Sequence, residues 1–306
     1  MFRTIFIALS ENRMIRRIAE RSAMGRKVSG RFVAGMTVAG VLDATARTNA
    51  LGMSVSVDNL GENVTNIVEA KESAALYNEL IDDITERKLE ANVSLKLTHM
   101  GLDLDPALAR SIVSDLVGHA VRANNFVRVD MEGSPYTQKT LDVVRELHAQ
   151  PGHEGHVGAV IQAYLRRSEA DVLDLCASAI RIRLCKGAYK ENAEIAFQDK
   201  ADVDANFVRL MKVLLKSGTY HGIATHDPRM IEATIAFARA ENIPPTAFEF
   251  QMLYGVRRDL QEQLVRDGWR MRVYIPFGTE WYPYLMRRLA ERPANLLFIL
   301  KNLFRR

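Results

Sequence analysis

Short β-rich runs alternate with helix-length segments eight times along this chain, and that alternation constrains the fold more than any other feature. The β-rich runs are expected at 53–58, 91–97, 126–131, 157–162, 180–184, 220–225, 247–251 and 271–275. Segments with a 3.6-residue apolar period lie at 37–50, 69–86, 105–123, 137–149, 169–175, 201–216, 228–241 and 257–267. Repeated strand–helix units predict a parallel sheet closed into a (β/α)8 barrel of the TIM type.

An open, doubly wound α/β sheet is the competing architecture. Its usual phosphate-binding signatures are not present, because no G-x-G-x-x-G follows the first β-rich run and no G-x-x-x-x-G-K-[ST] occurs. No linker rich in proline, glycine or serine divides the chain. We therefore expect N-terminal accessory helices over 1–50 and one catalytic barrel domain over 51–306, which includes the last helix.

Charge is unevenly distributed. The net charge is +4, yet residues 1–31 hold eight arginine or lysine residues against two glutamates, so the remainder carries −2. A near-neutral body does not suit nucleic-acid binding. The basic, amphipathic arm could be an accessory helix packed on the barrel, a peripheral attachment to an anionic membrane surface, or a targeting peptide.

The number of cysteines and the length of the apolar runs indicate the cellular compartment. Only Cys176 and Cys185 occur, and no apolar run reaches the roughly 18 residues that a membrane span needs. We expect a cytoplasmic protein, either free or peripherally attached to the inner face of the membrane. The sequence leaves the oligomeric state open.

Polar residues occupy the carboxyl ends of nearly all the expected strands. They are Asp58, Lys96, Asp130, Gln162, Arg183, Thr225, His226, Gln251 and Tyr274. A single one would be read as a loop contact, but the series predicts a lined pocket, because the carboxyl ends of barrel strands converge on the face that carries active sites.

The stretch 271–293 adds a helix to this face. A turn is expected at 276–278, followed by a helix with Pro283 in its first turn. Tyr284, Arg287, Arg288 and Glu291 share one side of that helix because their offsets are 0, 3, 4 and 7. Taken alone, that side could be an ordinary solvated surface.

The expected pocket has an excess of positive charge. It would hold Lys96, Arg183, Lys186, Arg287 and Arg288 against Asp130, Glu62 and Glu291. Such a pocket suits a small carboxylate, a phosphate-bearing cofactor or both. Two alternatives remain: a lyase that uses Lys96 as a Schiff base, and a non-catalytic anion-binding barrel. No metal site is expected, because the histidines of the 153–156 loop lack a metal-binding helical spacing.

Seven motifs in this order resemble the proline dehydrogenase family, most closely its small monofunctional bacterial members. They are Ser-Leu-Lys-Leu at 94–97, Val-Arg-Val-Asp-Met-Glu at 127–132, Gln-Ala-Tyr-Leu-Arg-Arg at 162–167, Arg-Leu-Cys-Lys-Gly-Ala-Tyr at 183–189, Ala-Thr-His-Asp at 224–227, Phe-Glu-Phe-Gln-Met-Leu-Tyr-Gly at 248–255 and Tyr-x2-Arg-Arg-x2-Glu at 284–291. The resemblance runs from about residue 51 to the C-terminus.

The resemblance implies a distorted barrel that holds FAD without a covalent bond. It further implies that L-proline is oxidised to Δ1-pyrroline-5-carboxylate by hydride transfer to flavin N5, and that the electrons pass to a membrane quinone.

The resemblance also assigns roles to individual residues. Asp130 and Arg183 match the family's active-site pair, with Arg183 next to flavin N5. Matches to substrate-binding positions are Lys96, Arg287, Arg288, Tyr274, Tyr284, Tyr189 and Leu253. Matches to FAD-contacting positions are Met131, Gln162, Arg183, Lys186, Gly187, Ala188, Thr225, His226 and Glu291. Glu62 matches a glutamate that gates the site.

Overall fold

The structure is a computed structural model that describes Ser22 and residues 30–291, with side chains described as far as Met286. The basic arm at 1–31, for which three readings were left open, falls almost wholly outside the described residues. The side chains of Arg287, Arg288 and Glu291 fall outside them as well.

Eight parallel strands pair in sequence order and close into a barrel, with β1 hydrogen-bonded to β8. The strands are β1 (Ser54–Asn59), β2 (Ala91–Leu95), β3 (Val127–Val129), β4 (Val157–Gln162), β5 (Arg181–Cys185), β6 (His221–Ala224), β7 (Phe248–Leu253) and β8 (Met271–Phe277). The predicted (β/α)8 fold is confirmed, and the open doubly wound sheet is excluded.

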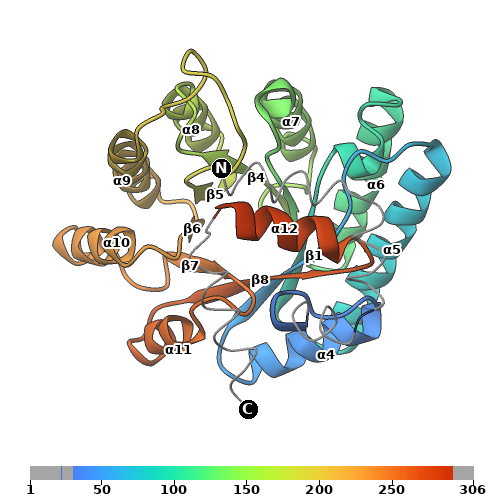
Figure 1. Cartoon of the computed structure of the whole chain (residues 1–306), viewed down its shortest axis with the longest axis horizontal. Helices are drawn as coiled ribbons and strands as arrows, with labels where there is room; N and C mark the ends of the chain where they lie inside the picture. Colours follow the sequence, from blue (N-terminus) through green and yellow to red (C-terminus); the bar gives the residue numbers. More distant parts are fainter. Residues whose placement is uncertain (1–21, 23–29, 292–306) are drawn as a thin grey trace.

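Helices form a ring outside the strands (Figure 1). They are α4 (Val38–Asn49), α5 (Ile67–Glu86), α6 (Pro106–Arg122), α7 (Ser134–His148), α8 (Ser168–Ala177), α9 (Lys200–Lys216), α10 (Pro228–Ala240) and α11 (Arg258–Arg266), with a 3-10 turn η1 (Thr98–Met100) after β2. Side-chain caps define where several helices begin. The side chains of Asn66, Asp105 and Asp227 accept hydrogen bonds from backbone N–H groups in the first turns of α5, α6 and α10.

The apolar core lies between the strands and the helix ring. Val55 and Val57 of β1 and Val93 and Leu95 of β2 are fully buried on the outward side of the sheet. The intervening positions face the lumen and are largely polar, so the centre of the barrel is held by hydrogen bonds. Buried polar groups are tolerated only when they are paired, and the lumen supplies that pairing.

Two strands extend two residues beyond their expected ends. β7 continues to Leu253, and β8 continues through Pro276 to Phe277, where a turn was expected. Pro276 has no N–H, but its carbonyl accepts from Ala34 N–H at 2.9 Å and the Phe277 carbonyl accepts from Leu60 N–H at 2.8 Å. These bonds keep the backbone extended until Gly278, whose φ of 116° makes the turn.

The last described helix is α12 (Trp281–Glu291), which follows β8. It lies across the middle of the ring in Figure 1, at the carboxyl ends of the strands. α4, which precedes the first strand, lies against β1 and β8. Within the described ranges, no helix combines the length and apolar character needed to cross a membrane.

Candidate active site

Arg183 occupies the centre of the lumen. It is the third residue of β5, is 6% exposed, and reaches across the barrel. Its guanidinium donates from Nη1 to Oδ1 of Asp130 (2.7 Å) and from Nε to Oε1 of Gln251 (2.5 Å). Nη2 donates to Oγ of Ser56 (3.0 Å). Contacts with residues from β1, from the end of β3 and from β7 fix this side chain against rotation.

Asp130 is held as a carboxylate. Besides Arg183, its Oδ1 accepts from Oγ of Ser94 (2.8 Å) and its Oδ2 accepts from the hydroxyl of Tyr274 (2.8 Å). Burial alone would raise the pKa of Asp130, but Arg183 and Lys96 lower it below its usual value. The residue therefore keeps a negative charge between two cations.

Lys96 completes this charged cluster. Its Nζ lies 3.1 Å from Oδ1 of Asp58 and 3.7 Å from Oδ2 of Asp130. Burial alone would lower the pKa of Lys96, but Asp58, Asp130 and Glu62 together raise it well above its usual value. Lys96 is therefore an ammonium group, whereas Schiff-base formation needs the neutral amine.

Sequence reasoning placed Asp58 at a strand end without giving it a role. The structure buries it to 1% exposure and pairs it with Lys96. Burial raises the pKa of Asp58 to about 6. The inward alternation of β1 was a usable signal, because it puts Ser56 and Asp58 on the same side of the strand as the lumen.

A second group of predicted residues follows β4 and β5. Gln162 donates from Nε2 to the carbonyl of Glu132 (3.0 Å) and accepts from Ala188 N–H at Oε1 (3.2 Å). Nζ of Lys186 donates to Oδ2 of Asp227 (2.8 Å) and to Asp204. The roles of Asp204 and Asp227 as partners of Lys186 had not been foreseen, because they come from α9 and from the loop after β6.

The ends of β6 and β7 are joined through His226. Its Nε2 accepts from Leu253 N–H at 2.9 Å, which assigns the proton of the neutral ring to Nδ1. Thr225 is buried, and its hydroxyl accepts from Asp227 N–H at 3.1 Å. Met131, just after β3, is also buried.

The remaining predicted residues lie on loops and on α12. Tyr284 is buried, whereas Tyr189 is 36% exposed, and a Cβ placed on Gly133 would lie 3.9 Å from its ring. Glu62 follows β1 and lies close enough to Lys96 to raise its pKa. The structure thus gathers Lys96, Asp130, Arg183 and Tyr274 into one cluster and puts Tyr189 at the rim.

Comparisons with known proteins agree on one family. The family model described as "Proline dehydrogenase" matches residues 41–301. "Proline dehydrogenase 2" of Bacillus subtilis is 39% identical over 305 residues, which cover 98% of each chain. "Proline dehydrogenase" of Deinococcus radiodurans is 40% identical over 257 residues, 83% of each chain.

A solved structure gives the same result. The crystal structure of proline utilization A from Bdellovibrio bacteriovorus inactivated by N-propargylglycine superposes with a TM-score of 0.84 at 27% identity. The match covers 95% of the present chain and 36% of that longer one.

Proposed function

This chain belongs to the proline dehydrogenase family, and from that premise we propose that it oxidises L-proline to Δ1-pyrroline-5-carboxylate with FAD as cofactor and a membrane quinone as electron acceptor. The observation that carries the proposal is the charged cluster of Lys96, Asp130, Arg183 and Tyr274, in which Asp130 and Arg183 are buried. It lies at the carboxyl ends of the strands, where barrel enzymes carry their chemistry.

The donor set around β4 to β6 fits a flavin nucleotide. Gln162, Thr225 and His226 offer amide, hydroxyl and imidazole groups of the kind that hydrogen-bond a heteroaromatic ring, while the Lys186 ammonium and the backbone at Gly187 and Ala188 suit a diphosphate. Further proposed contacts are Met131 and Glu291. When bound, FAD supplies at its N5 atom the acceptor for the hydride that leaves the proline ring carbon next to nitrogen.

Lys96, with Arg287 and Arg288, would bind the substrate carboxylate. Charge-assisted bonds of this kind contribute roughly 1.5–3 kcal/mol each. Because they fix both the distance and the angle of the ring, they lower the entropy cost of reaching a reactive geometry. Tyr274, Tyr284, Tyr189 and Leu253 would form the walls around the ring, and Glu62 would gate the entrance.

Arg183 would act as an electrostatic catalyst in contact with the cofactor. Its guanidinium is already oriented by Asp130 and Gln251, so no reorganisation is needed when negative charge develops on the electron acceptor. Asp130 would hold that orientation and limit the repulsion between Arg183 and Lys96.

The absorbance spectrum of the purified protein tests the proposal. A flavin spectrum that L-proline bleaches, together with reduction of a dye acceptor, is the expected result. A colourless protein that cannot take up FAD would refute it. Trapping of Lys96 by borohydride with a carbonyl substrate would favour the lyase instead, and carboxylate binding without electron transfer would favour the anion-binding barrel.

Because a membrane quinone is the proposed acceptor, we propose that the protein is cytoplasmic and associates with the inner face of the membrane. The basic arm is the segment proposed to contact anionic lipids. Deletion of residues 1–20 should then reduce flotation with anionic vesicles, and equal flotation of both forms would contradict this contact.

A further inference from the structure

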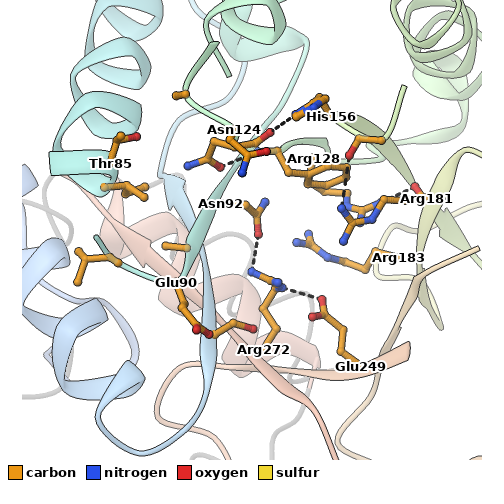
Figure 2. A pocket seen from close by; sticks show the side chains of 18 of the residues that line it. Thr85, Glu90, Asn92, Asn124, Arg128, His156, Arg181, Arg183, Glu249 and Arg272 are labelled. Atoms are coloured by element: carbon orange, nitrogen blue, oxygen red, sulfur yellow. Dashed lines mark hydrogen bonds and ion pairs between the residues drawn. The ribbon is translucent and has the colours of Figure 1, made fainter. Parts of the chain in front are cut away.

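The amino ends of the strands enclose a cavity of about 400 Å³ that lies on the other side of Arg183 and Gln251 from Lys96. Figure 2 shows this lower cavity, with Asn92, Arg128, Arg181, Arg183, Glu249 and Arg272 converging on it. Exposed residues such as Lys88 and Asn124 also line it, so it is reached from solvent.

Arg128 is built into the wall of the lower cavity. It is 4% exposed, and its Nη1 donates to the carbonyls of Ala159 (2.9 Å) and Arg181 (2.6 Å). Gly158 makes room for it, because a Cβ there would lie 2.7 Å from that nitrogen. The guanidinium carbon lies 4.6 Å from the centre of the Phe126 ring.

Arg181 faces the same ring, with its guanidinium carbon 4.4 Å from the centre of Phe126. Its Nε is buried and has no hydrogen-bond partner among the described residues. An unmatched donor of this kind costs free energy unless a ligand or water satisfies it.

The charges around the lower cavity are not balanced. Glu249 pairs with Arg272 at 2.6 Å, and its oxygens also accept from Gln251 Nε2 and the Tyr220 hydroxyl. In the part of the chain that the structure describes, no carboxylate lies within salt-bridge distance of Arg128 or Arg181. Burial, followed by the fields of Arg183 and Arg181, holds the pKa of Arg128 well below its usual value.

We propose that the lower cavity binds a small oxyanion, either a phosphate group or a carboxylate, between Arg128 and Arg181. Guanidinium groups match the planar, multi-oxygen geometry of these anions. The cavity exceeds the size of one inorganic ion, so this chemistry specifies the charged end of a larger ligand. Arg183 and Gln251, which hydrogen-bond to each other and line the lower cavity, lie between this site and Lys96.

Calorimetric titration of the FAD-loaded protein tests the site. The probes are inorganic phosphate and acetate at constant ionic strength, which distinguish the two classes of anion. Arg181→Gln should weaken saturable binding about tenfold or more, because one charge-assisted interaction is lost. Arg288→Gln, at the other end of the barrel, should leave that binding unchanged. Saturable binding of either probe with this pattern supports the proposal.

A second variant distinguishes a loss of anion binding from a folding defect in Arg181→Gln. Asn92→Asp keeps the acceptor for Arg272 Nη1 (3.0 Å), loses the donation from Nδ2 to the Val93 carbonyl (2.8 Å) and adds a negative charge to the cavity, so it should also weaken binding. Flavin absorbance and unfolding temperature check that each variant is folded. Absence of saturable binding to the wild type, or loss of binding in Arg288→Gln with retention in Arg181→Gln, would overturn the assignment.

Discussion

Nζ of Lys96 lies 3.1 Å from Oδ1 of Asp58 at the upper end of the lumen, where Asp58 is buried and Lys96 is half-buried. The same lysine is 3.7 Å from Asp130, so two carboxylates share one ammonium group. The pKa values of the two carboxylates differ. Arg183 contacts Asp130 but not Asp58 and lowers the pKa of Asp130, whereas burial raises the pKa of Asp58 to about 6. On acidification, Asp58 is therefore the first of the two to take up a proton.

This difference predicts a pH dependence of anion binding at the upper cluster. Protonation of Asp58 removes a negative charge beside Lys96, so a five-membered ring carboxylate without the amine should bind more tightly at about pH 5.5 than at about pH 7.5. The extra affinity is present below the Asp58 pKa of about 6 and is lost as the pH rises through it.

Spectral titration of the flavin with that carboxylate measures the effect. Asp58→Asn should remove most of the dependence, since its side chain stays neutral at both pH values. An equally steep dependence in Asp58→Asn would show that another group controls binding.

Gly187 predicts a steric requirement of the proposed cofactor site. Its φ is 118°, and a Cβ there would lie 2.2 Å from the Tyr164 ring, so Gly187→Ala should displace the loop and lower the flavin content of the purified protein several-fold. Gly218→Ala is the matched control, because Gly218 also has a positive φ (79°) but an added Cβ would meet nothing within 4 Å. Equal flavin content in both variants would contradict a specific role for this contact.

The burial of two histidines, His99 and His221, could not be predicted from the sequence. Nothing in the pattern around His99 or His221 marks either as buried, yet they are 7% and 1% exposed. Burial lowers the pKa of His99 to about 4 and that of His221 to about 3. The decisive contacts come from other elements: Ser73 of α5 for His99, and Ile182 of β5 for His221.

These values predict acid destabilisation. The unfolded chain binds protons at His221 below its usual pKa of about 6.5, whereas the folded protein does not, so the free energy of unfolding should fall as the pH is lowered from about 7 to about 4. Chemical unfolding at several pH values measures this fall. His221→Asn should be less stable near pH 7 but lose less stability on acidification. If the free energy of unfolding of His221→Asn falls with pH as steeply as that of the wild type, groups other than His221 cause the acid destabilisation.

The barrel was predictable because each strand carries its own local signal, while the details of the lumen depend on register. Polar strand ends predicted convergence, and Lys96, Asp130 and Tyr274 do lie in contact. The hydrogen bonds from Arg183 to Ser56 and Ser94 were not predicted, because a serine in a strand has no distinctive pattern. They become visible only when eight strands are aligned and Arg183 is seen to reach across the barrel.

The predicted end of β8 at residue 275 was wrong, and the reason lies in the backbone contacts of Pro276. Proline is normally a strand terminator because it lacks an N–H group. At Pro276 the carbonyl is used by Ala34, and the strand continues. Tyr274 lies inside both the expected strand and the observed one, and its hydroxyl donates to Asp130.

The proposed carboxylate clamp leads to the sharpest kinetic prediction. Arg288→Ala should raise the apparent KM for proline about 10–100-fold, because one charge-assisted bond is lost and about 1.4 kcal/mol corresponds to a factor of ten. Flavin content should change less, since the substitution leaves the donors around β4 to β6 intact. Arg266→Ala, on the exposed helix α11, removes the same charge far from the clamp and should leave KM unchanged. If KM for Arg288→Ala equals that of Arg266→Ala, the helix that follows β8 does not bind the substrate carboxylate, and Lys96 must hold it without that arginine.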